Sequence, residues 1–335
     1  MAAPAWQHAR MRFVVVGAGA IGGVVGARLH QSGHEVVLLA RGAHLEALQT
    51  KGLRLRSPEE DVVLDVPAVR RPVDVAWRGD EVVLLATKSQ HSAALLDELA
   101  AAAPPGIALV SLQNGVDNER QALRRFERVY GICVMLPAQH LDPGVVEPAS
   151  HPITGILDIG RFPSGVDDTA RECAEALGRS TFESVARSAI MRWKYRKLLM
   201  NLANAVVALC PPSEAARELV RRAESEGDRC LEAAGIDVAS KSEDAARRGD
   251  RLQIRPVGGR PWGGGSSWQS LARGLGSIEA DFLNGEIVLL GRLHGVGTPV
   301  NALLQERARE AARLGLPPGQ VPAESLLEQV EARAG

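Results

Sequence analysis

Short apolar runs alternate with stretches of helical spacing over the first half of the chain. The runs are rich in Val, Leu and Ile, and they occupy residues 12–16, 35–40, 81–86, 107–112, 129–135, 153–159 and 182–185. Residues 91–102 and 164–178 have helical spacing, whereas 52–78 read as short strands and loops. Continuous apolar runs are typical of buried parallel strands, and their alternation with helices indicates βαβ units. The pattern predicts an N-terminal α/β domain with a doubly wound parallel sheet.

Helical spacing dominates the second half of the chain. It begins after a change of composition near Ser188, and the stretches cover residues 190–209, 213–234, 268–294 and 299–314. Beyond Val185 the strand pattern does not recur. We therefore expect an all-α C-terminal domain, with a disordered lead-in over residues 1–10, an α/β domain over 11–188 and a helical domain over 189–330. Met11 is an alternative start of the chain.

Composition and charge narrow the classes of function. The 335 residues are 45% hydrophobic and 24% charged, and the formal net charge is -1. A nearly neutral chain gives no support for binding to nucleic acid or to a membrane surface, and no apolar run reaches the length of a membrane span. The four cysteines lie far apart and form no CxxC pair, which favours reduced thiols in a cytoplasmic protein over metal ligands.

A glycine-rich turn connects the first apolar run to the helical stretch that follows it. Residues 17–22 read GAGAIG, which is a G-x-G-x-x-G motif. Gly17 permits the sharp turn, Gly19 leaves room for a pyrophosphate, and Gly22 lets the helix pack close to the strand. We expect this turn, including Ala20 and Ile21, to bind a dinucleotide at the start of the helix. The alternative is a tight turn without a ligand.

An arginine follows the second apolar run. NAD-binding folds have an acidic residue near this point that binds the ribose 2′-hydroxyl, but this chain has Arg41 and no carboxylate before Glu46. A guanidinium would pair with a 2′-phosphate through charge-assisted hydrogen bonds. We therefore favour NADPH/NADP+ over NAD, with a solvated surface arginine as the alternative.

Two more polar residues follow apolar runs that end at the same edge of the predicted sheet. Lys88 comes shortly after the run 81–86, and Asn114 comes shortly after 107–112. Open α/β sheets bind ligands at the carboxyl ends of their strands. Lys88 would then face the phosphates or ribose of the cofactor, and Asn114 its nicotinamide amide or a substrate oxygen. The alternatives are a surface lysine and an ordinary Asn-Gly turn.

A polar stripe marks the first helical stretch of the second half. Trp193, Lys197, Asn201 and Asn204 follow one another at steps of four, four and three residues, which puts them on one helix face. Buried Lys and Asn need partners, so the stripe favours a wet cleft between the domains over a solvent-exposed face. Beside a nicotinamide, a protonated Lys197 would polarise a ketone and supply its proton. Asn201 and Asn204 would hold substrate oxygens.

Ser267 and Glu279 complete the set of candidates. Ser267 follows a run of glycines and would bind a carboxylate at the start of a helix, with a plain N-cap serine as the alternative. Glu279 would anchor Lys197 or a ribose hydroxyl, or else it is an ordinary exposed glutamate. The two residues are twelve positions apart, which is about 18 Å along a straight helix. A common site therefore requires a break, which we expect at Gly274 or Gly276.

The motifs together resemble the ketopantoate reductase family, which is also called the 2-dehydropantoate 2-reductase family. The resemblance covers about residues 11–315, and the positions that carry it are Arg41, Lys88 in Ala-Thr-Lys, Asn114 in Gln-Asn-Gly, Lys197 four residues before Asn201, Ser267, and Glu279 in IEADFLNG. It implies a Rossmann-type domain, a helical domain, and reduction of 2-dehydropantoate to (R)-pantoate with NADPH. In the implied roles Lys197 donates the proton and Glu279 positions it. The implied cofactor contacts are Glu279, Arg41, Lys88 and Asn114, and the implied substrate contacts are Asn201, Asn204 and Ser267.

Two departures from the family pattern leave the substrate open. The family spaces these residues as W-x-K-x-x-x-N-x-x-x-N, whereas two extra residues separate Trp193 from Lys197, and Asn204 follows Asn201 by three positions. On a straight helix this moves one substrate contact by about 100°. We keep two alternatives, a reductase of another 2-keto acid or imine and a non-catalytic NADP(H)-binding regulator. The apolar helices also leave a homodimer open.

Overall fold

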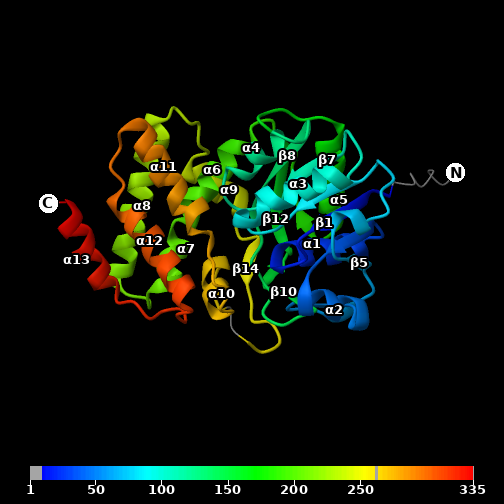
Figure 1. Ribbon diagram of the computed structural model, residues 1–335, viewed down its shortest axis with the longest axis horizontal. Coiled ribbons are helices and arrows are strands. Elements are labelled where there is room, and N and C mark those ends of the chain that lie inside the picture. Colours follow the sequence, from blue (N-terminus) through cyan, green and yellow to red (C-terminus); the bar gives the residue numbers. More distant parts are fainter. Residues whose placement is uncertain (1–9, 261–262, 335) are drawn as a thin grey trace.

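A sheet flanked by helices forms one end of the molecule, and a bundle of helices forms the other (Figure 1). This computed structural model describes residues 10–260 and 263–334. The lead-in expected over residues 1–10 therefore lies, except for Arg10, outside the described residues. The arrangement confirms the predicted fold class, an α/β domain followed by a helical domain.

An eight-stranded sheet is the centre of the N-terminal domain. Its strands are β1 (Arg12–Val16), β2 (Glu35–Leu39), β5 (Ala68–Val69), β6 (Val82–Leu85), β7 (Ala108–Ser111), β8 (Arg128–Met135), β12 (Gly155–Arg161) and β13 (Phe182–Glu183). Their order is β13-β12-β8-β7-β6-β1-β2-β5. All neighbours pair in parallel except β12, which is antiparallel to β8. The strand order reverses direction beside β1, which is where doubly wound sheets bind ligands.

Helices cover both faces of this sheet. They are α1 (Ala20–Gln31), α2 (Gly42–Lys51), α3 (Ser92–Ala102), α4 (Asn118–Leu123) and α5 (Asp168–Arg179), with short 3-10 turns at Pro72–Asp74 and Ser89–His91. Successive side chains of a strand point to opposite faces. Phe13 and Val15 of β1 accordingly belong to a buried cluster with α1 and α5, whereas Val14 and Val16 belong to one with α3 and α4. Both faces of β1 are therefore core, as its uninterrupted apolar sequence predicts.

Two small sheets lie beside the large one. The strands β3 (Leu53–Arg56), β4 (Asp61–Leu64), β9 (Ala138–Gln139) and β10 (Val145–Pro148) form the first, and β11 (Ser150–Pro152) pairs with β14 (Leu252–Ile254) to form the second. The expectation of no strand beyond Val185 is thus wrong. Three residues of β14 pair with the N-terminal domain through an antiparallel ladder, and so short a strand has no period that the sequence could reveal.

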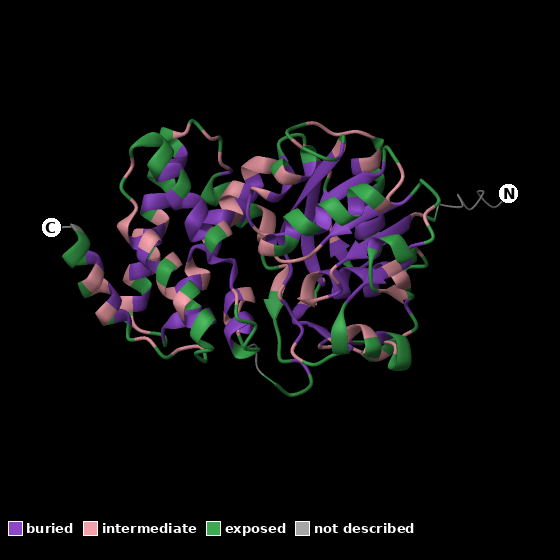
Figure 2. Ribbon diagram, viewed as in Figure 1, coloured by how far each residue is buried: buried purple, intermediate pink, exposed green. Residues whose placement is uncertain are grey.

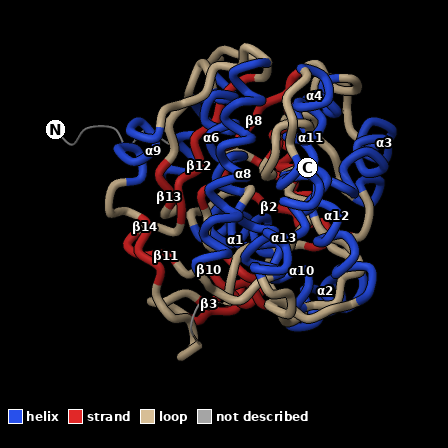
Figure 3. Tube along the Cα trace, turned by 90° about the vertical axis from the view of Figure 1, so that its left-hand side faces the viewer, coloured by secondary structure: helices blue, strands red, loops and turns tan. Residues whose placement is uncertain are grey.

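The C-terminal half is a bundle around its own apolar core. Its helices are α6 (Ile190–Asn201), α7 (Ala203–Leu209), α8 (Glu214–Ala233), α9 (Lys241–Arg248), α10 (Ser266–Ala272), α11 (Asn284–His294), α12 (Pro299–Leu314) and α13 (Ala323–Ala334), with a 3-10 turn at Glu279–Phe282. Buried residues line the inner faces of these helices (Figure 2). Seen from the helical end, α8, α12 and α13 lie in front of the sheet (Figure 3). No helix in the described part of the chain combines the length and apolarity that crossing a membrane requires.

Two helices that the sequence predicts as continuous are interrupted. The helix expected over 190–209 divides at Leu202, whose N–H donates to the carbonyl of Leu199, at 3.2 Å, in place of the usual fourth residue back. The stretch 268–294 breaks after Ala272, where Gly274 and Gly276 have φ of 59° and 67°. This second break is the one expected, because left-handed backbone at these glycines ends a helix.

Candidate active site

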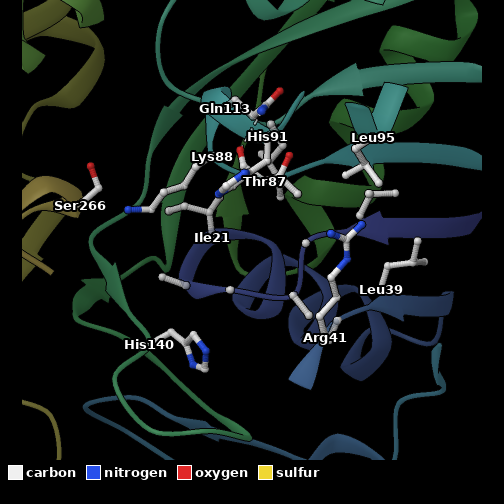
Figure 4. Close-up of a pocket in the computed structure, with 18 of the residues that line it drawn as sticks. Ile21, Leu39, Arg41, Thr87, Lys88, His91, Leu95, Gln113, His140 and Ser266 are labelled. Carbon is white, nitrogen blue, oxygen red and sulfur yellow. Dashed lines mark hydrogen bonds between the residues drawn. The ribbon is translucent and has the colours of Figure 1, made fainter. Parts of the chain in front are cut away.

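A cavity of about 570 Å³ lies between the two domains at the carboxyl ends of the central strands. The glycine-rich turn and the residues that follow β2, β6 and β7 line one side, and α10 with the segment that follows it lines the other. The predicted site residues that line it are Gly17, Gly19, Ala20, Ile21, Arg41, Lys88, Asn114 and Glu279. In Figure 4, Lys88 extends toward Ser266 at one end of this cavity, and Arg41 lies beside Leu39 at the other. Residues of both domains therefore line the cavity.

The backbone of the glycine-rich turn suits a bound pyrophosphate. Gly17 has a φ of 103°, and its N–H and that of Ala18 donate to the carbonyl of Leu39. A Cβ on Gly22 would lie 2.1 Å from the carbonyl oxygen of Gly17, so a side chain there would push helix and strand apart. A Cβ on Gly19 would meet no protein atom within 4 Å and would stand in the cavity. The open space in front of Gly19 therefore fits the dinucleotide that the motif predicts.

Arg41 lies at the end of the cavity where β2 leads into α2. Its side chain is 65% exposed and makes an ion pair of 3.4 Å with Glu98 of α3. A pair so exposed contributes little, because water screens both charges. The guanidinium can therefore exchange this partner for a phosphate at low cost, as the predicted contact with a 2′-phosphate requires.

Hydrogen bonds between the domains hold Lys88 and Glu279. The Nζ of Lys88 donates to the Oγ of Ser270 on α10. The Oε1 of Glu279 accepts hydrogen bonds from the N–H of Ser89, at 3.0 Å, and from its Oγ, at 3.1 Å. Burial lowers the pKa of Lys88, which the charge of Glu279 opposes and that of Arg273 reinforces. Both domains therefore contribute to this end of the cavity.

The expected contact between Glu279 and Lys197 is not found among the described residues. Glu279 follows the break in the chain at Gly276, and its carboxylate bonds to the turn after β6 instead. Lys197 lies in a narrow crevice that also includes Cys133 and shares Gln113, Asn114 and Val134 with the large cavity. Asn114, which follows β7, is thus one of three residues that line both spaces.

Lys197 has no hydrogen bond or ion pair within the described ranges, and this leaves its amino group available to a ligand. Burial lowers its pKa, the nearby Cys133 and Asp244 raise it, and Arg248 lowers it. Burial likewise raises the pKa of the Cys133 thiol to about 12, so this neighbour is a neutral group near pH 7. A lysine in such a place holds its proton less tightly than one in water.

The remaining predicted substrate residues lie around this crevice. The Nδ2 of Asn201 donates to the Oδ1 of Asn114 at 3.1 Å, which joins α6 to the end of β7. The Oδ1 of Asn204 would lie 3.5 Å from a Cβ built on Gly265, so Asn204 faces the segment that precedes α10. Ser267 is 3% exposed and does not line the large cavity, whereas its neighbour Ser266 does.

Trp193, at the start of the predicted stripe, is packed away from the cavities. It is 8% exposed, and the guanidinium of Arg187 lies 3.9 Å from its ring centroid. Its partners in the core include Cys133 and Ile190. The four residues of the stripe therefore do not all face one cleft, because Trp193 is a core residue and the helix divides before Asn204.

Lys194, which lies three residues before Lys197, is not among the residues that the sequence pattern predicts for the site. Its Nζ lies 2.6 Å from the Oε1 of Glu119, and it donates to the carbonyls of Gln113 and Ile132. Both side chains of the ion pair are buried, at 2% and 0% exposed. The pair fixes α6 against β8 and the end of β7, next to Asn114. The sequence feature that could have indicated Lys194 is its spacing of three residues from Lys197, since residues three apart share a helix face.

Comparisons with known proteins agree over most of the chain. Residues 13–164 match the family model described as ketopantoate reductase PanE/ApbA, and residues 189–312 match the model of its C-terminal part. The chain is 28% identical over 312 residues to a 2-dehydropantoate 2-reductase of Pyrococcus horikoshii, covering 91% of this chain and 99% of the relative. It is 29% identical over 322 residues to one of Halobacterium salinarum, covering 91% and 100%.

Solved structures show the same architecture. A PanE/ApbA family ketopantoate reductase from Ralstonia eutropha superposes with a TM-score of 0.76 at 27% identity, covering 91% of this chain and 99% of that one. A D-mandelate dehydrogenase with NADH shares the fold, with a TM-score of 0.77 at 21% identity and coverage of 91% and 99%. Since the family models together match well over half of the residues, this chain belongs to the ketopantoate reductase family.

Proposed function

We propose that this chain reduces 2-dehydropantoate to (R)-pantoate, a step in pantothenate and coenzyme A synthesis, with NADPH as the hydride donor. The observation that carries the proposal is the junction of two spaces, which Gln113, Asn114 and Val134 line together. A cavity with the features of a dinucleotide site meets a crevice that contains Lys197, a half-buried lysine without a hydrogen bond or ion pair among the described residues. Relatives named 2-dehydropantoate 2-reductase, which match nearly their whole length, support the choice of substrate.

The cavity offers a group for each part of the cofactor. The backbone of Gly17 to Ile21 would hold the pyrophosphate, Arg41 the 2′-phosphate, and Lys88 with Glu279 the ribose or the phosphates. When bound, the nicotinamide supplies the hydride. The protein contributes binding, orientation and exclusion of water.

Lys197 would donate the proton that the reduced carbonyl oxygen requires. Its ammonium form polarises the carbonyl, and burial, which lowers its pKa, makes its proton easier to transfer. Asn201 donates to the Oδ1 of Asn114 and so occupies the acceptor of this amide. The Nδ2 of Asn114 is then the group that would donate to a substrate or nicotinamide oxygen.

Asn201, Asn204 and Ser267 remain the proposed substrate contacts. Division of the helix at Leu202 means that the angle between Asn201 and Asn204 is not that of a straight helix. The displacement of about 100° that a straight helix implies therefore does not apply, and the choice between 2-dehydropantoate and another 2-keto acid rests on the assay of turnover. We also propose that Glu279 positions Lys197 once the two domains close around cofactor and substrate, since it bonds to Ser89 in this structure.

Consumption of NADPH, followed by its near-ultraviolet absorbance, tests the proposal. The expected result is that kcat/KM for 2-dehydropantoate exceeds that for a panel of other 2-keto acids and imines. A higher kcat/KM for another member of the panel would assign a different substrate to the same chemistry. Tight NADPH binding without turnover of any member would favour the regulator.

Two further proposals concern the cellular location and the oligomeric state of the enzyme. All four cysteines are free and buried, which supports a cytoplasmic location with reduced thiols. Leu289 and Leu293, one turn apart on α11, are 48% and 67% exposed. They support a homodimer, whose presence sedimentation equilibrium would measure.

A further inference from the structure

One face of α10 forms the wall of the cavity opposite the glycine-rich turn. Ser266, Ser270 and Arg273 lie at steps of four and three residues, so they share one side of this helix, and all three line the cavity. Their elements come from the helical domain, whereas the turn comes from the sheet. Anything that fills the cavity is therefore contacted from both domains.

Two of these side chains have polar groups without protein partners. The Oγ of Ser266 is buried and has no hydrogen bond among the described residues. Arg273 is an exposed residue at the cavity, and its guanidinium makes no hydrogen bond or ion pair in the part of the chain that the structure describes. Ser270 is occupied, because it donates to the carbonyl of Ser266 at 2.8 Å and accepts from Lys88. A buried hydroxyl without a partner costs stability, so its presence points to a ligand group that satisfies it.

The charge on this side of the cavity is positive. Arg273 lowers the pKa of Lys88 and of His44, which places its charge near the glycine-rich turn, since His44 bonds to the carbonyl of Ala18. The carboxylate of Glu279 is already bonded to Ser89. Lys88, whose Nζ reaches this wall from the side of the turn, and Arg273 thus have no ion-paired carboxylate among the described residues, and two such cations attract an anion.

We propose that Ser266 and Arg273 bind the pyrophosphate of the dinucleotide from the helical domain, opposite the glycine-rich turn. The inference rests on the proposed function for the identity of the ligand. It deepens that function, because the cofactor then connects the two domains before the keto acid binds. Loss of either side chain weakens cofactor binding without touching the proton donor.

The test compares Arg273→Gln with Arg292→Gln. Arg292 is an exposed arginine on α11 that lines neither cavity, so its replacement makes the same change of charge elsewhere on the helical domain. Dissociation constants are measured for NADPH, NADH, ADP and 2′-AMP. Arg273→Gln is expected to raise those for NADPH, NADH and ADP about tenfold or more, and to leave 2′-AMP unchanged, because a charge-assisted contact to the pyrophosphate is lost. Arg292→Gln leaves all four at the wild-type values.

Three results would overturn the proposal. These are unchanged ADP affinity in Arg273→Gln, a loss confined to 2′-AMP and NADPH, and no competition by ADP for the wild-type site. The second result would place Arg273 at the 2′-phosphate. A wild-type protein that binds NADPH but reduces no 2-dehydropantoate would contradict the proposed function alone, because the binding comparison does not use turnover.

Ser266→Ala distinguishes a role in cofactor binding from a role in the fold, through the shift in melting temperature that NADPH produces. Removing a buried hydroxyl without a partner leaves the thermal stability of the free protein unchanged or raises it. The increase in melting temperature that NADPH produces is expected to be smaller than in the wild type. A variant with lower stability when free and an unchanged response to NADPH would show that Ser266 serves the fold only.

Discussion

His140 makes the stability of the cavity wall dependent on pH. Its ring is 5% exposed, its Nδ1 lies 2.9 Å from the carbonyl oxygen of Val145, and its centroid lies 4.2 Å from that of His44. Burial, followed by the nearby charge of His44, lowers the pKa of His140 from 6.5 to about 4. The folded protein therefore holds this imidazole in its neutral form.

The size of the effect follows from the two pKa values. At about 1.4 kcal/mol per pH unit, the interval between 6.5 and about 4 corresponds to about 3 kcal/mol. The unfolded chain binds the proton more readily than the folded one, so this stability is complete above pH 6.5. It is lost progressively as the pH falls toward 4. His44, whose pKa burial also lowers, acts in the same direction.

Urea unfolding of the wild type and of His140→Phe, at several pH values between 7 and 4, measures this contribution. Phe keeps an aromatic ring beside His44 but does not titrate. Carboxylates titrate alike in both proteins, so their effect cancels in the difference between the two free energies of unfolding. Between pH 7 and pH 4, the free energy of unfolding of the wild type is expected to fall by about 3 kcal/mol more than that of His140→Phe. A difference that stays constant with pH would refute the reasoning.

Three further predictions concern other parts of the site. Lys194→Met leaves Glu119 buried without its partner and is expected to lower the free energy of unfolding by about 3–5 kcal/mol, measured by urea unfolding, with much of the loss recovered when Glu119→Leu is added. Gly22→Ala is expected to lower the melting temperature, whereas Gly19→Ala keeps it and weakens NADPH binding, as titration of cofactor fluorescence would show. Arg41→Ala is expected to raise the dissociation constant for NADPH about tenfold and to leave that for NADH unchanged, and equal losses for both cofactors would contradict the assigned contact.

The sequence predicts best those parts of the site that depend on local structure. The glycine-rich turn, Lys88 and Asn114 follow strands whose apolar runs are clear, and parallel strands bring their carboxyl ends to one edge. The break near Gly274 was predictable because glycine ends helices. Gly17 and Gly19 of the turn, Lys88 and Asn114 line one cavity, as their positions in the pattern require.

The pattern of hydrophobic and polar positions could not predict contacts between segments that are distant in the sequence. Leu202 is a good helix former, and nothing local announces the division of the helix there. Lys194 looks like any helical lysine, because its partner Glu119 lies far away in the sequence. Glu279 bonds to Ser89 in the other domain, a contact set by the packing of the two halves. Pairings of this kind depend on tertiary structure, which periodicity does not encode.

The kcat of Lys197→Ala with NADPH and 2-dehydropantoate tests the central claim most directly. Loss of the proton donor is expected to lower kcat by about 10²–10⁴-fold, with the NADPH dissociation constant and the melting temperature near the wild-type values. Lys241→Ala, which removes an exposed lysine at the start of α9, serves as the control. A Lys197→Ala enzyme with a kcat close to that of the wild type would contradict the account.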